Sequence, residues 1–483
     1  MENAENGVVV NTLVVKGCEA VPVAVRATVR PDGAPGVEID GLSETAQEEM
    51  RAAVRCALVA AGYWLPRQHV HIEIAPEVRG RTLSGLELPV AAALLAASGQ
   101  IPKAGLDECR LIGDLSLEGK VLPSEGVRLF QTQHPEGVGL VASCGCDGDV
   151  LPAGRYASEV LGIGGLGELR CGVSSLTSCS PGSLTEVIGE DVEAGFGEDV
   201  ARAVEVACAG GHNLLLKGAD EAALMAAADS VATCMPAPTE AEAVRIAAMT
   251  SIGAGADGRD GIGGRPTVFW DARTGTLPEL IGGGRPVRPG AVSMAAGGAL
   301  VIGHIDEMSE AASQMLAIAM FDREVRVVRA DGSFLMPADT MVVGCVGPEG
   351  RLPEALRGFP FACANVDARP EPGHGANVAE VRRTVEAARD FAREADGRIE
   401  ALSDDPEDLV ARTIADLAGA RDVDIDHQGE AHDMTRAATG RLFIYRVPAR
   451  APELSLDALA SEKAMEAQAL GGEGLAARTG DAR

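Results

Sequence analysis

The segment AGGHNLLLKGADEAALMAAA, residues 209 to 228, places an apolar strand before Gly218 and a helix-forming run after it. In a nucleotide-binding protein, a phosphate-binding P-loop, GxxxxGK[ST], would lie between this strand and this helix. Its glycines let backbone N–H groups surround the phosphates, its Lys reaches the β and γ phosphates, and its hydroxyl binds Mg²⁺. Counted from Gly218, the Lys position holds Leu224 and the hydroxyl position holds Met225. The sequence therefore keeps the order of elements of a nucleotide site but lacks the side chains that bind a triphosphate.

The residues that follow Gly218 oppose phosphate binding. Asp220 and Glu221 put two negative charges where the phosphates would lie. Loss of the Lys removes a charge-assisted contact typically worth ~1.5–3 kcal/mol, so either change alone costs roughly tenfold in binding. Lys217 directly precedes Gly218 at the end of the strand, and we expect its amine to be solvated or paired instead of curling over the loop.

The composition is that of a multidomain α/β protein. The chain has 483 residues, 46% of them hydrophobic but only 3% aromatic, and 59 glycines, which favours two or three domains of closely packed α/β layers. The net charge of −29 disfavours a general attraction to DNA, which would need a local basic surface. Eleven scattered cysteines and the absence of a long apolar run predict reduced thiols, a cytoplasmic location and no membrane segment.

Two sequence features contain metal-binding residue types, and both are incomplete. Cys144 and Cys146 in SCGCDG lack a second pair or a nearby His to complete a tetrahedral zinc site. His69 and His71 alternate along a predicted strand and so share one face, with no third ligand in view. We therefore expect no bound metal.

The order of elements divides the chain into five segments. Runs of β-branched residues, a helix from Glu44 to Ala61 with Ser43 as N-cap, an apolar helix in LELPVAAALLAASG and a hairpin turning at Glu118 and Gly119 indicate a first α/β domain. The predicted segments are this domain (8–165), a Gly-, Ser- and acid-rich linker (166–195), a second α/β domain (196–370), a small domain of amphipathic helices (371–436) and a tail expected to be disordered (437–483).

Several segments carry a family resemblance in the same order over residues 8 to 436. They are GLSETAQEEMRAAVRCALVAAGYWLP, HVHIEIAPEV, LELPVAAALLAASGQIP and LIGDLSLEGKVLP, followed by RAVEVACAGGHNLLL, ELIGGGRPVRPGAVSMAAGGAL and LVARTIADLAGARDVDIDH. Together they resemble the magnesium-chelatase-like AAA+ family of the ComM (YifB) type. The resemblance implies an N-terminal Lon-protease-like (ribosomal S5 domain 2-like) α+β domain, an AAA+ P-loop-type α/β core and a C-terminal helical subdomain.

The resemblance further implies an ATP-driven ring protein. ComM-type proteins are associated with DNA processing during natural transformation, as hexameric helicases acting in branch migration. The family's P-loop has two later glycines, whose positions hold Glu221 and Ala223 in this chain. The family also ends a second strand in Asp-Glu, where Asp helps to hold Mg²⁺ and Glu polarises the attacking water. In GGALVIGHIDEM these two positions hold Gly303 and His304.

Asp306 and Glu307 follow three residues after these positions. They could supply the acidic pair only in a shifted register, in which Gly303 and His304 would interrupt a buried strand. We therefore interpret Asp306 and Glu307 as an acidic pair at a helix N-terminus, where negative charge is favourable to the helix dipole.

Three other family positions have also changed. The expected sensor Asn falls among Cys345, Val346 and Gly347. The family's Arg-containing segment corresponds to FPFACANVD, and no Arg lies between Arg357 and Arg369. The segment with paired His in the family corresponds to TVFWDARTG, which has no His.

Arg412 in VARTIADLAG matches a family position that would reach a γ-phosphate from the helical domain. An ion pair with Asp408 or Asp416 on the same helix surface explains this Arg equally well. The sequence leaves both interpretations of Arg412 open.

The N-terminal domain shows no convincing protease site. A Lon-type site needs a Ser nucleophile activated by a Lys. Glu87 and Leu88 occupy the relevant neighbourhood, with Ser84 as the nearby hydroxyl and Lys120 as the candidate base. Because hydroxyls and lysines at turns are usually solvated, we expect no Ser84/Lys120 dyad.

We therefore favour a pseudo-ATPase: a degenerate member of the family that folds like an ATPase without hydrolysing ATP and acts through protein partners, or through self-association as an AAA+-like ring, in DNA uptake or recombination. No cofactor is expected. The alternative is an active ATP-binding AAA+ ATPase or DNA branch-migration helicase, which would bind ATP and Mg²⁺. DNA is possible by the resemblance, but the net charge disfavours it because DNA motors need basic pore loops. A decaying paralogue without a current function is a third possibility.

Overall fold

An eight-stranded mixed sheet forms the first domain, in the order β10-β9-β8-β5-β1-β2-β4-β3. The computed structural model describes residues 7–30, 34–78, 84–133, 139–182, 195–253, 264–284, 287–329, 332–366, 376–394 and 405–439. Burial alternates along much of β2 and over residues 8–11 of β1, as β-branched runs with one face on a core require. The strands are β1 (Val8–Lys16), β2 (Glu19–Arg30), β3 (Gly36–Asp40), β4 (His69–Ala75), β5 (Cys109–Leu111), β8 (Gly139–Ser143), β9 (Val160–Ile163) and β10 (Thr177–Ser178).

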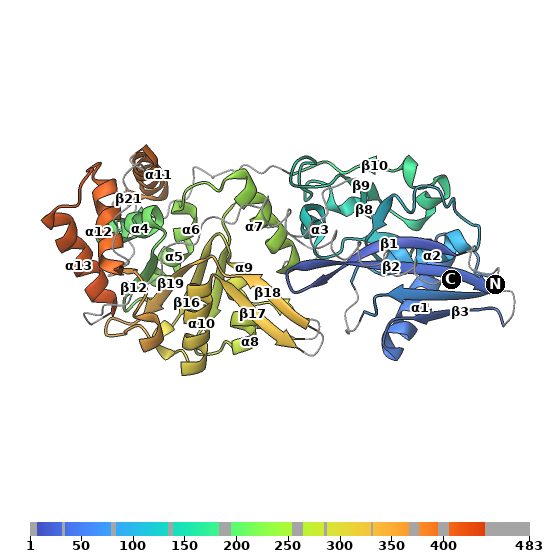
Figure 1. Cartoon of the computed structure of the whole chain (residues 1–483), viewed down its shortest axis with the longest axis horizontal. Helices are drawn as coiled ribbons and strands as arrows, with labels where there is room; N and C mark the ends of the chain where they lie inside the picture. Colours follow the sequence, from blue (N-terminus) through green and yellow to red (C-terminus); the bar gives the residue numbers. More distant parts are fainter. Residues whose placement is uncertain are drawn as a thin grey trace, which may run out of the picture.

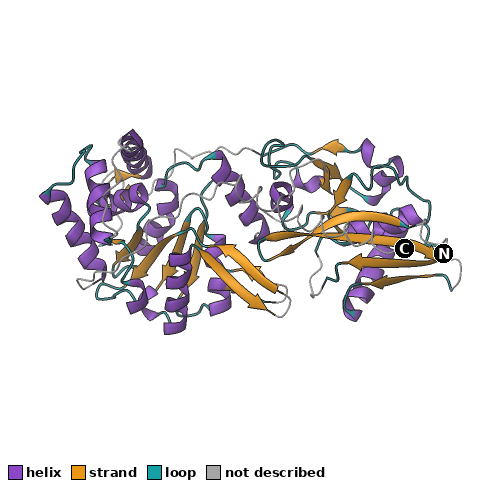
Figure 2. Ribbon diagram, in the orientation of Figure 1, coloured by secondary structure: helices purple, strands orange, loops and turns teal. Residues whose placement is uncertain are grey.

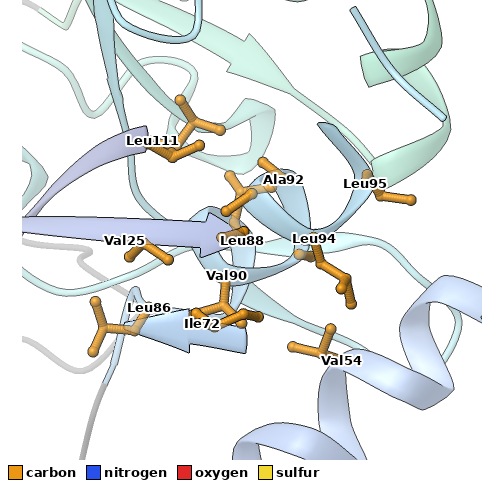
Figure 3. Packing of buried hydrophobic residues seen from close by; sticks show 14 of the residues in the cluster. Val25, Val54, Ile72, Leu86, Leu88, Val90, Ala92, Leu94, Leu95 and Leu111 are labelled. Carbon is orange, nitrogen blue, oxygen red and sulfur yellow. The ribbon is translucent and has the colours of Figure 1, made fainter. Parts of the chain in front are cut away.

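One helix, α2 (Glu87–Ala97), is the centre of this domain's core. All residues from Leu88 to Ala96 are buried, because the helix lies between the sheet and α1 (Glu44–Ala60). Figure 3 shows Leu88 and Val90 beside Val25 of β2, and Leu94 facing Val54 of α1. A helix that is apolar all round is stable only when it is covered on every side. The predicted apolar helix is confirmed.

The hairpin of β6 (Asp114–Leu115) and β7 (Val121–Leu122) is also confirmed, with Gly119 in the left-handed region at φ 81°. The helix α3 (Val127–Gln133) and the 3₁₀ turn η1 (Cys144–Cys146) follow it.

The first domain continues beyond residue 165, where we placed the start of the linker. Two 3₁₀ turns, η2 (Leu166–Cys171) and η3 (Val173–Ser175), precede β10, which is the edge strand of the sheet. Leu166, Leu169 and Val173 are buried in the same core as α2. Short 3₁₀ turns have no apolar periodicity, so the Gly- and Ser-rich composition concealed this structure. Residues 183–194 of the predicted linker lie outside the described residues.

The second domain contains a five-stranded, fully parallel sheet in the order β13-β16-β19-β12-β20. Its central strands are apolar throughout, because helices cover both faces (Figure 2). The strands are β12 (Asn213–Lys217), β13 (Thr267–Asp271), β16 (Ala299–Gly303), β19 (Met341–Val346) and β20 (Phe361–Asn365). The helices are α4 (Glu198–Gly210), α5 (Glu221–Asp229), α6 (Val231–Cys234), α7 (Glu240–Gly253), α8 (Leu277–Ile281), α9 (Ala291–Met294) and α10 (Glu310–Asp322).

Shorter elements complete this domain. A hairpin of β17 and β18 follows α10 (Figure 1). The elements are β17 (Glu324–Arg329), β18 (Gly332–Pro337), the pairs β11 (Gly195–Phe196) with β21 (Ala376–Asn377) and β14 (Gly282–Gly283) with β15 (Arg288–Pro289), and the 3₁₀ turns η4 (Ile305–Glu307) and η5 (Glu354–Leu356).

Three C-terminal helices pack against α4 and β20. They are α11 (Val378–Glu394), α12 (Pro406–Leu417) and α13 (Ile425–Thr439). The helices predicted for residues 371–436 therefore exist, but their buried side chains share one hydrophobic cluster with the sheet core instead of forming their own. Helix α13 also extends three residues past the predicted boundary at 436, while residues 440–483 of the predicted tail lie outside the described residues.

The two domains meet through α3 and α7, which lie between the sheets in Figure 1. Cys18, at the tip of the β1–β2 hairpin, and Leu129 of α3 are buried in a cluster formed mainly by the second domain. Three polar contacts support the junction: Gly126 N to Ser251 O at 2.9 Å, Gly17 N to Val287 O at 3.0 Å, and Arg288 Nη1 to Glu125 Oε2 at 2.9 Å. Within the described residues, no helix combines the length and apolar character needed to cross a bilayer.

Candidate functional site

The carboxyl ends of the parallel strands meet along one edge of the second sheet. Asp271 at the end of β13 is in register with Gly303 at the end of β16, and Lys217 at the end of β12 is in register with Val346 of β19. Ligands of open α/β sheets bind outside this edge. Of the sequence-predicted nucleotide positions, Gly218, Gly303 and His304 lie at this edge.

The connection between β12 and α5 is short. Only residues 218 to 220 separate the last strand residue, Lys217, from the first helical residue, Glu221. In GxxxxGK[ST] counted from Gly218, the fourth to sixth positions would still belong to the loop, whereas here they form the first turn of α5. Gly218 donates to Val346 O at 3.1 Å, and a Cβ on it would lie 2.5 Å from Val366 O. The glycine is thus required by the close approach of neighbouring backbone.

The side chain of Asp220 caps α5. Its Oδ1 accepts hydrogen bonds from Ala222 N at 2.9 Å and Ala223 N at 3.2 Å. Free N–H groups at a helix N-terminus are the donors that bind phosphate in nucleotide sites. In this chain a carboxylate of the protein itself accepts from two of these donors.

Removing this cap should cost stability without disturbing the fold. We expect Asp220→Ala to lower the free energy of unfolding by about 1 kcal/mol, because two helix donors lose their acceptor. Urea denaturation measures the difference. Asp220→Ser is the matched control, since a Ser hydroxyl caps equally well, and an equal loss in both variants would contradict the capping role.

The two positions that should carry the Lys and hydroxyl of a P-loop face the protein interior. Leu224 is buried in the hydrophobic cluster beneath the sheet, and Met225 packs against the same cluster. Ala223 is also buried there. The side chains at these positions therefore contribute to the core instead of the strand edge.

The two cations considered for the nucleotide site, Lys217 and Arg412, are bound elsewhere. Lys217 Nζ donates to Ala437 O at 2.9 Å, in the last turn of α13, where positive charge is favourable. Arg412 pairs with Asp416, one of its two expected partners, and Arg412 Nη1 donates to Arg421 O at 2.7 Å. Arg412 therefore stabilises the carboxyl end of α12.

His304 has an unusual backbone and a charged environment. Its φ of 53° and ψ of 46° are left-handed, which is uncommon for a residue with a side chain. Its imidazole lies between two carboxylates, with Nε2 3.8 Å from Glu221 Oε1 and Nδ1 3.7 Å from Asp271 Oδ2. Nδ1 is buried and makes no hydrogen bond to the described residues. The ring thus lies between carboxylates at the start of α5 and at the end of β13.

The prediction that Asp306 and Glu307 begin a helix is wrong. Both lie in η4, and α10 starts only at Glu310, with Ser309 as its cap. Glu307 instead forms an ion pair with Arg273 at 2.7 Å, and that hydrogen bond lowers the pKa of the exposed Glu307 carboxyl. A single 3₁₀ turn has no apolar periodicity that would reveal it in the sequence.

Sequence reasoning missed Asp271 and Arg273 as site residues. They lie in TVFWDARTG, where the sequence showed only that no His is present. A usable signal existed in the sequence, because Asp271 ends an apolar run. In the structure this run forms β13, which pairs with β16, and Asp271 Oδ1 accepts a hydrogen bond from Arg273 N at 2.7 Å in the following turn. The pairing of Arg273 with Glu307 spans β13 and η4 and has no local signal.

The predicted sensor region is apolar. Cys345 is buried, and burial raises the pKa of its thiol to about 12, so the thiol stays protonated. The backbone carbonyl of Val346 accepts the hydrogen bond from Gly218 N. No described atom would come within 4 Å of a Cβ at Gly347.

The other candidate residues have separate partners. Ser84 Oγ donates to Asp114 at 2.7 Å, whereas Lys120 pairs with Glu118 at 3.3 Å on the surface. His69 and His71 share a face of the sheet, as predicted, and each contacts a carboxylate of β3. The Nε2 of His69 is 3.2 Å from Glu38 Oε2, and the Nε2 of His71 is 2.7 Å from Asp40 Oδ2. Within the described residues, no group of three or more His, Cys, Asp or Glu side chains is arranged to bind a metal.

Comparison with known proteins identifies the family. Residues 190–351 match the family model described as magnesium chelatase, subunit ChlI, and residues 25–134 match subunit ChlI of Mg-chelatase. The chain is 27% identical over 355 residues to the uncharacterized protein YifB of Escherichia coli, covering 70% of this chain and 68% of YifB. It is 24% identical over 333 residues to competence protein ComM of Haemophilus influenzae, covering 66% and 64% of the two chains. The chain belongs to the magnesium-chelatase-like family of the YifB and ComM type.

A further relative is an uncharacterized protein of Mycobacterium tuberculosis, 28% identical over 347 residues, with coverage of 70% of this chain and 68% of the relative. The two family-model matches lie one in each of the two sheet domains. The mixed α/β architecture with a parallel second sheet is consistent with an AAA+ core.

Proposed function

We propose that this chain is a non-hydrolysing member of its family, a pseudo-ATPase that acts as an assembly or regulatory protein in DNA uptake or recombination. The observation that carries the proposal is the carboxylate of Asp220, which accepts from Ala222 N and Ala223 N at the start of α5. A triphosphate would have to displace this internal anion and then lie beside Glu221. Like charges at such short range repel by several kcal/mol at about 4 Å in the dielectric of a protein surface.

The surrounding residues support the same conclusion. The position of the P-loop Lys is Leu224, buried in the core, and the amine of Lys217 is bound to the end of α13. The positions that would hold Mg²⁺ and polarise water are Gly303 and His304, and His304 itself contacts two carboxylates. No described cation is left to neutralise a γ-phosphate at the family's Arg412 position, because Arg412 pairs with Asp416.

The proposed cellular role derives from relatives. ComM of Haemophilus influenzae is named a competence protein, and natural competence involves DNA uptake. The apolar strands and the shared core of this chain are intact despite the substitutions at the sheet edge. Retained packing without nucleotide-binding side chains favours a protein that works through its surfaces, with protein partners or with copies of itself.

The decisive experiment measures nucleotide binding and turnover together. Purified protein is titrated with a fluorescent ATP analogue in the presence of Mg²⁺, and phosphate release is assayed in parallel, with an active P-loop ATPase as positive control. We expect no saturable binding at micromolar protein and no phosphate release above buffer. Micromolar binding with turnover would overturn the proposal and favour the active ATPase.

The assembly role has its own test. Light scattering should give the same molar mass with and without ATP and Mg²⁺, because ATP that does not bind cannot drive subunit association. Titration with a mixed-sequence DNA duplex at physiological salt should show no binding, given the net charge of −29. An ATP-dependent rise in mass would contradict the proposal.

A further inference from the structure

Three of the eleven cysteines lie together at the edge of the first sheet. Cys144 and Cys146 form the ends of η1, directly after β8, and Cys179 directly follows β10. Cys146 is buried, Cys179 is half-buried and Cys144 is exposed. Although Cys179 is more than thirty residues further along the chain, the residues that follow it lie beside the residues that follow η1.

Backbone contacts hold these two segments side by side. Asp147 Oδ1 accepts from Ser180 N at 2.5 Å, and Gly148 N donates to Ser180 O at 2.8 Å. Further on, Gly182 N donates to Val150 O at 2.9 Å. The segment after η1 and the segment after β10 therefore run together over several residues.

Two glycines, Gly162 of β9 and Gly164 directly after this strand, lie beside the two outer thiols. A Cβ on Gly162 would lie 3.0 Å from the Sγ of Cys179 and 3.4 Å from the Cβ of Cys144. A Cβ on Gly164 would lie 3.4 Å from the Sγ of Cys144 and 2.9 Å from Glu168 Oε1. Cys144 and Cys179 therefore both approach Gly162 closely. A side chain at Gly162 would have to displace the Sγ of Cys179 or the Cβ of Cys144.

We propose that Cys144 and Cys179 form a reversible disulfide when the protein meets a peroxide. The Cys144 thiol gives up its proton, its sulfur attacks one peroxide oxygen, and the O–O bond breaks. The hydroxide that leaves takes up that proton as water, and Cys144 becomes a sulfenic acid. The sulfur of Cys179 then attacks the sulfur of Cys144, the S–O bond breaks, and the proton of Cys179 leaves with hydroxide as a second water. Two thiols are oxidised by two electrons in total, and one hydrogen peroxide is reduced to two waters.

The environment assigns the order of the two steps. Cys144 is the exposed thiol of the group, so peroxide reaches it first. Burial, and then the charge of Asp147, raises the pKa of Cys179, which therefore acts second, on a sulfenic acid already beside it. Burial raises the pKa of Cys146 to about 12, which leaves that thiol inert.

The disulfide would clamp a weakly held strand. β10 has only two residues and pairs with β9 alone, through Thr177 with Gly162 and Ser178 with Leu161. A covalent bond from Cys179 to η1 would fix the point at which the chain leaves the sheet. Oxidation would thus stabilise the sheet edge that precedes the second domain.

Peroxide treatment of the full chain tests the proposal. The oxidised protein is blocked with a maleimide, digested without reductant and examined by mass spectrometry. We expect a peptide pair cross-linked through Cys144 and Cys179, the loss of two titratable thiols per chain, and recovery of both with dithiothreitol. Cross-linking of Cys144 to Cys146, or oxidation confined to other cysteines, would overturn the proposal.

Variants separate the two roles. In Cys179→Ser the sulfenic acid on Cys144 should persist and be trapped by dimedone, whereas Cys144→Ser should give neither the cross-link nor dimedone labelling at Cys179. Cys56→Ser and Cys171→Ser remove exposed thiols elsewhere and are the matched controls, in which the cross-link should form as in the parent. Dimedone labelling of Cys179 in Cys144→Ser would reverse the order of steps and contradict the assignment.

Discussion

The Leu224→Lys variant, which restores the P-loop Lys in sequence, is expected to lose about 4 kcal/mol of stability and still to bind no ATP. Leu224 is buried in the cluster that joins α5 to the parallel sheet. A Lys there removes apolar packing and must either bury an ammonium group or force the first turn of α5 apart. Urea denaturation gives the stability difference, and titration with the fluorescent ATP analogue gives the binding.

Leu224→Met is the matched control for this prediction. It keeps the volume and the apolar character of the site and should cost less than about 1.5 kcal/mol. If Leu224→Lys were as stable as Leu224→Met and bound the analogue, the position would face the strand edge and the site would lack only one group. A single substitution would then restore ATP binding, which would contradict the proposal that the whole site is degenerate.

The parts of the fold that the sequence predicted are those with local signals. The apolar helix α2, the hairpin at Gly119 and the strand before Gly218 each have a periodicity or a turn residue within a few positions. The sequence also located the substituted positions, because motif spacing is a local property. What it could not provide was the contacts that the side chain at each position makes in the fold.

The remaining features depend on pairs distant in the chain. Arg273 with Glu307 and His304 with Asp271 are fixed by the register of β13 beside β16, which no local pattern encodes. The burial of η2 in the first core, and of the C-terminal helices in the second, likewise results from tertiary packing. The cap by Asp220 is the exception, since an Asp before a helix is a local signal. The negative charge of Asp220 was interpreted as repelling phosphate, and its role as a helix cap was missed.

Acid stability should depend strongly on one buried histidine. His212 directly precedes β12, and its Nε2 is 2.9 Å from Thr413 Oγ1 of α12. Burial, followed by the charge of Arg389, lowers its pKa from 6.5 to about 4. The unfolded chain therefore binds the proton more readily, so the free energy of unfolding falls as pH drops from about 6.5 to 4, by about 3 kcal/mol in all.

Two half-buried carboxyls act in the opposite direction. Burial raises the pKa of Asp114 and of Glu87 at the start of α2. A raised carboxyl pKa means that the folded protein binds the proton more tightly, so these groups add stability as pH falls through their folded pKa values. The contribution of His212 therefore has to be isolated by comparison with a variant.

His212→Gln provides that comparison, because Gln does not titrate in this range and keeps a polar group near Thr413. Unfolding free energies from urea denaturation at pH 7 and pH 4.5 should fall by about 2.5 kcal/mol less in the variant than in the parent. The variant will be less stable at pH 7, which does not affect the difference between the two pH values. An identical pH dependence in the two proteins would show that His212 takes up its proton as readily in the folded chain as in the unfolded one. The interior between α4 and α12 would then have to admit a charge, against the burial observed there.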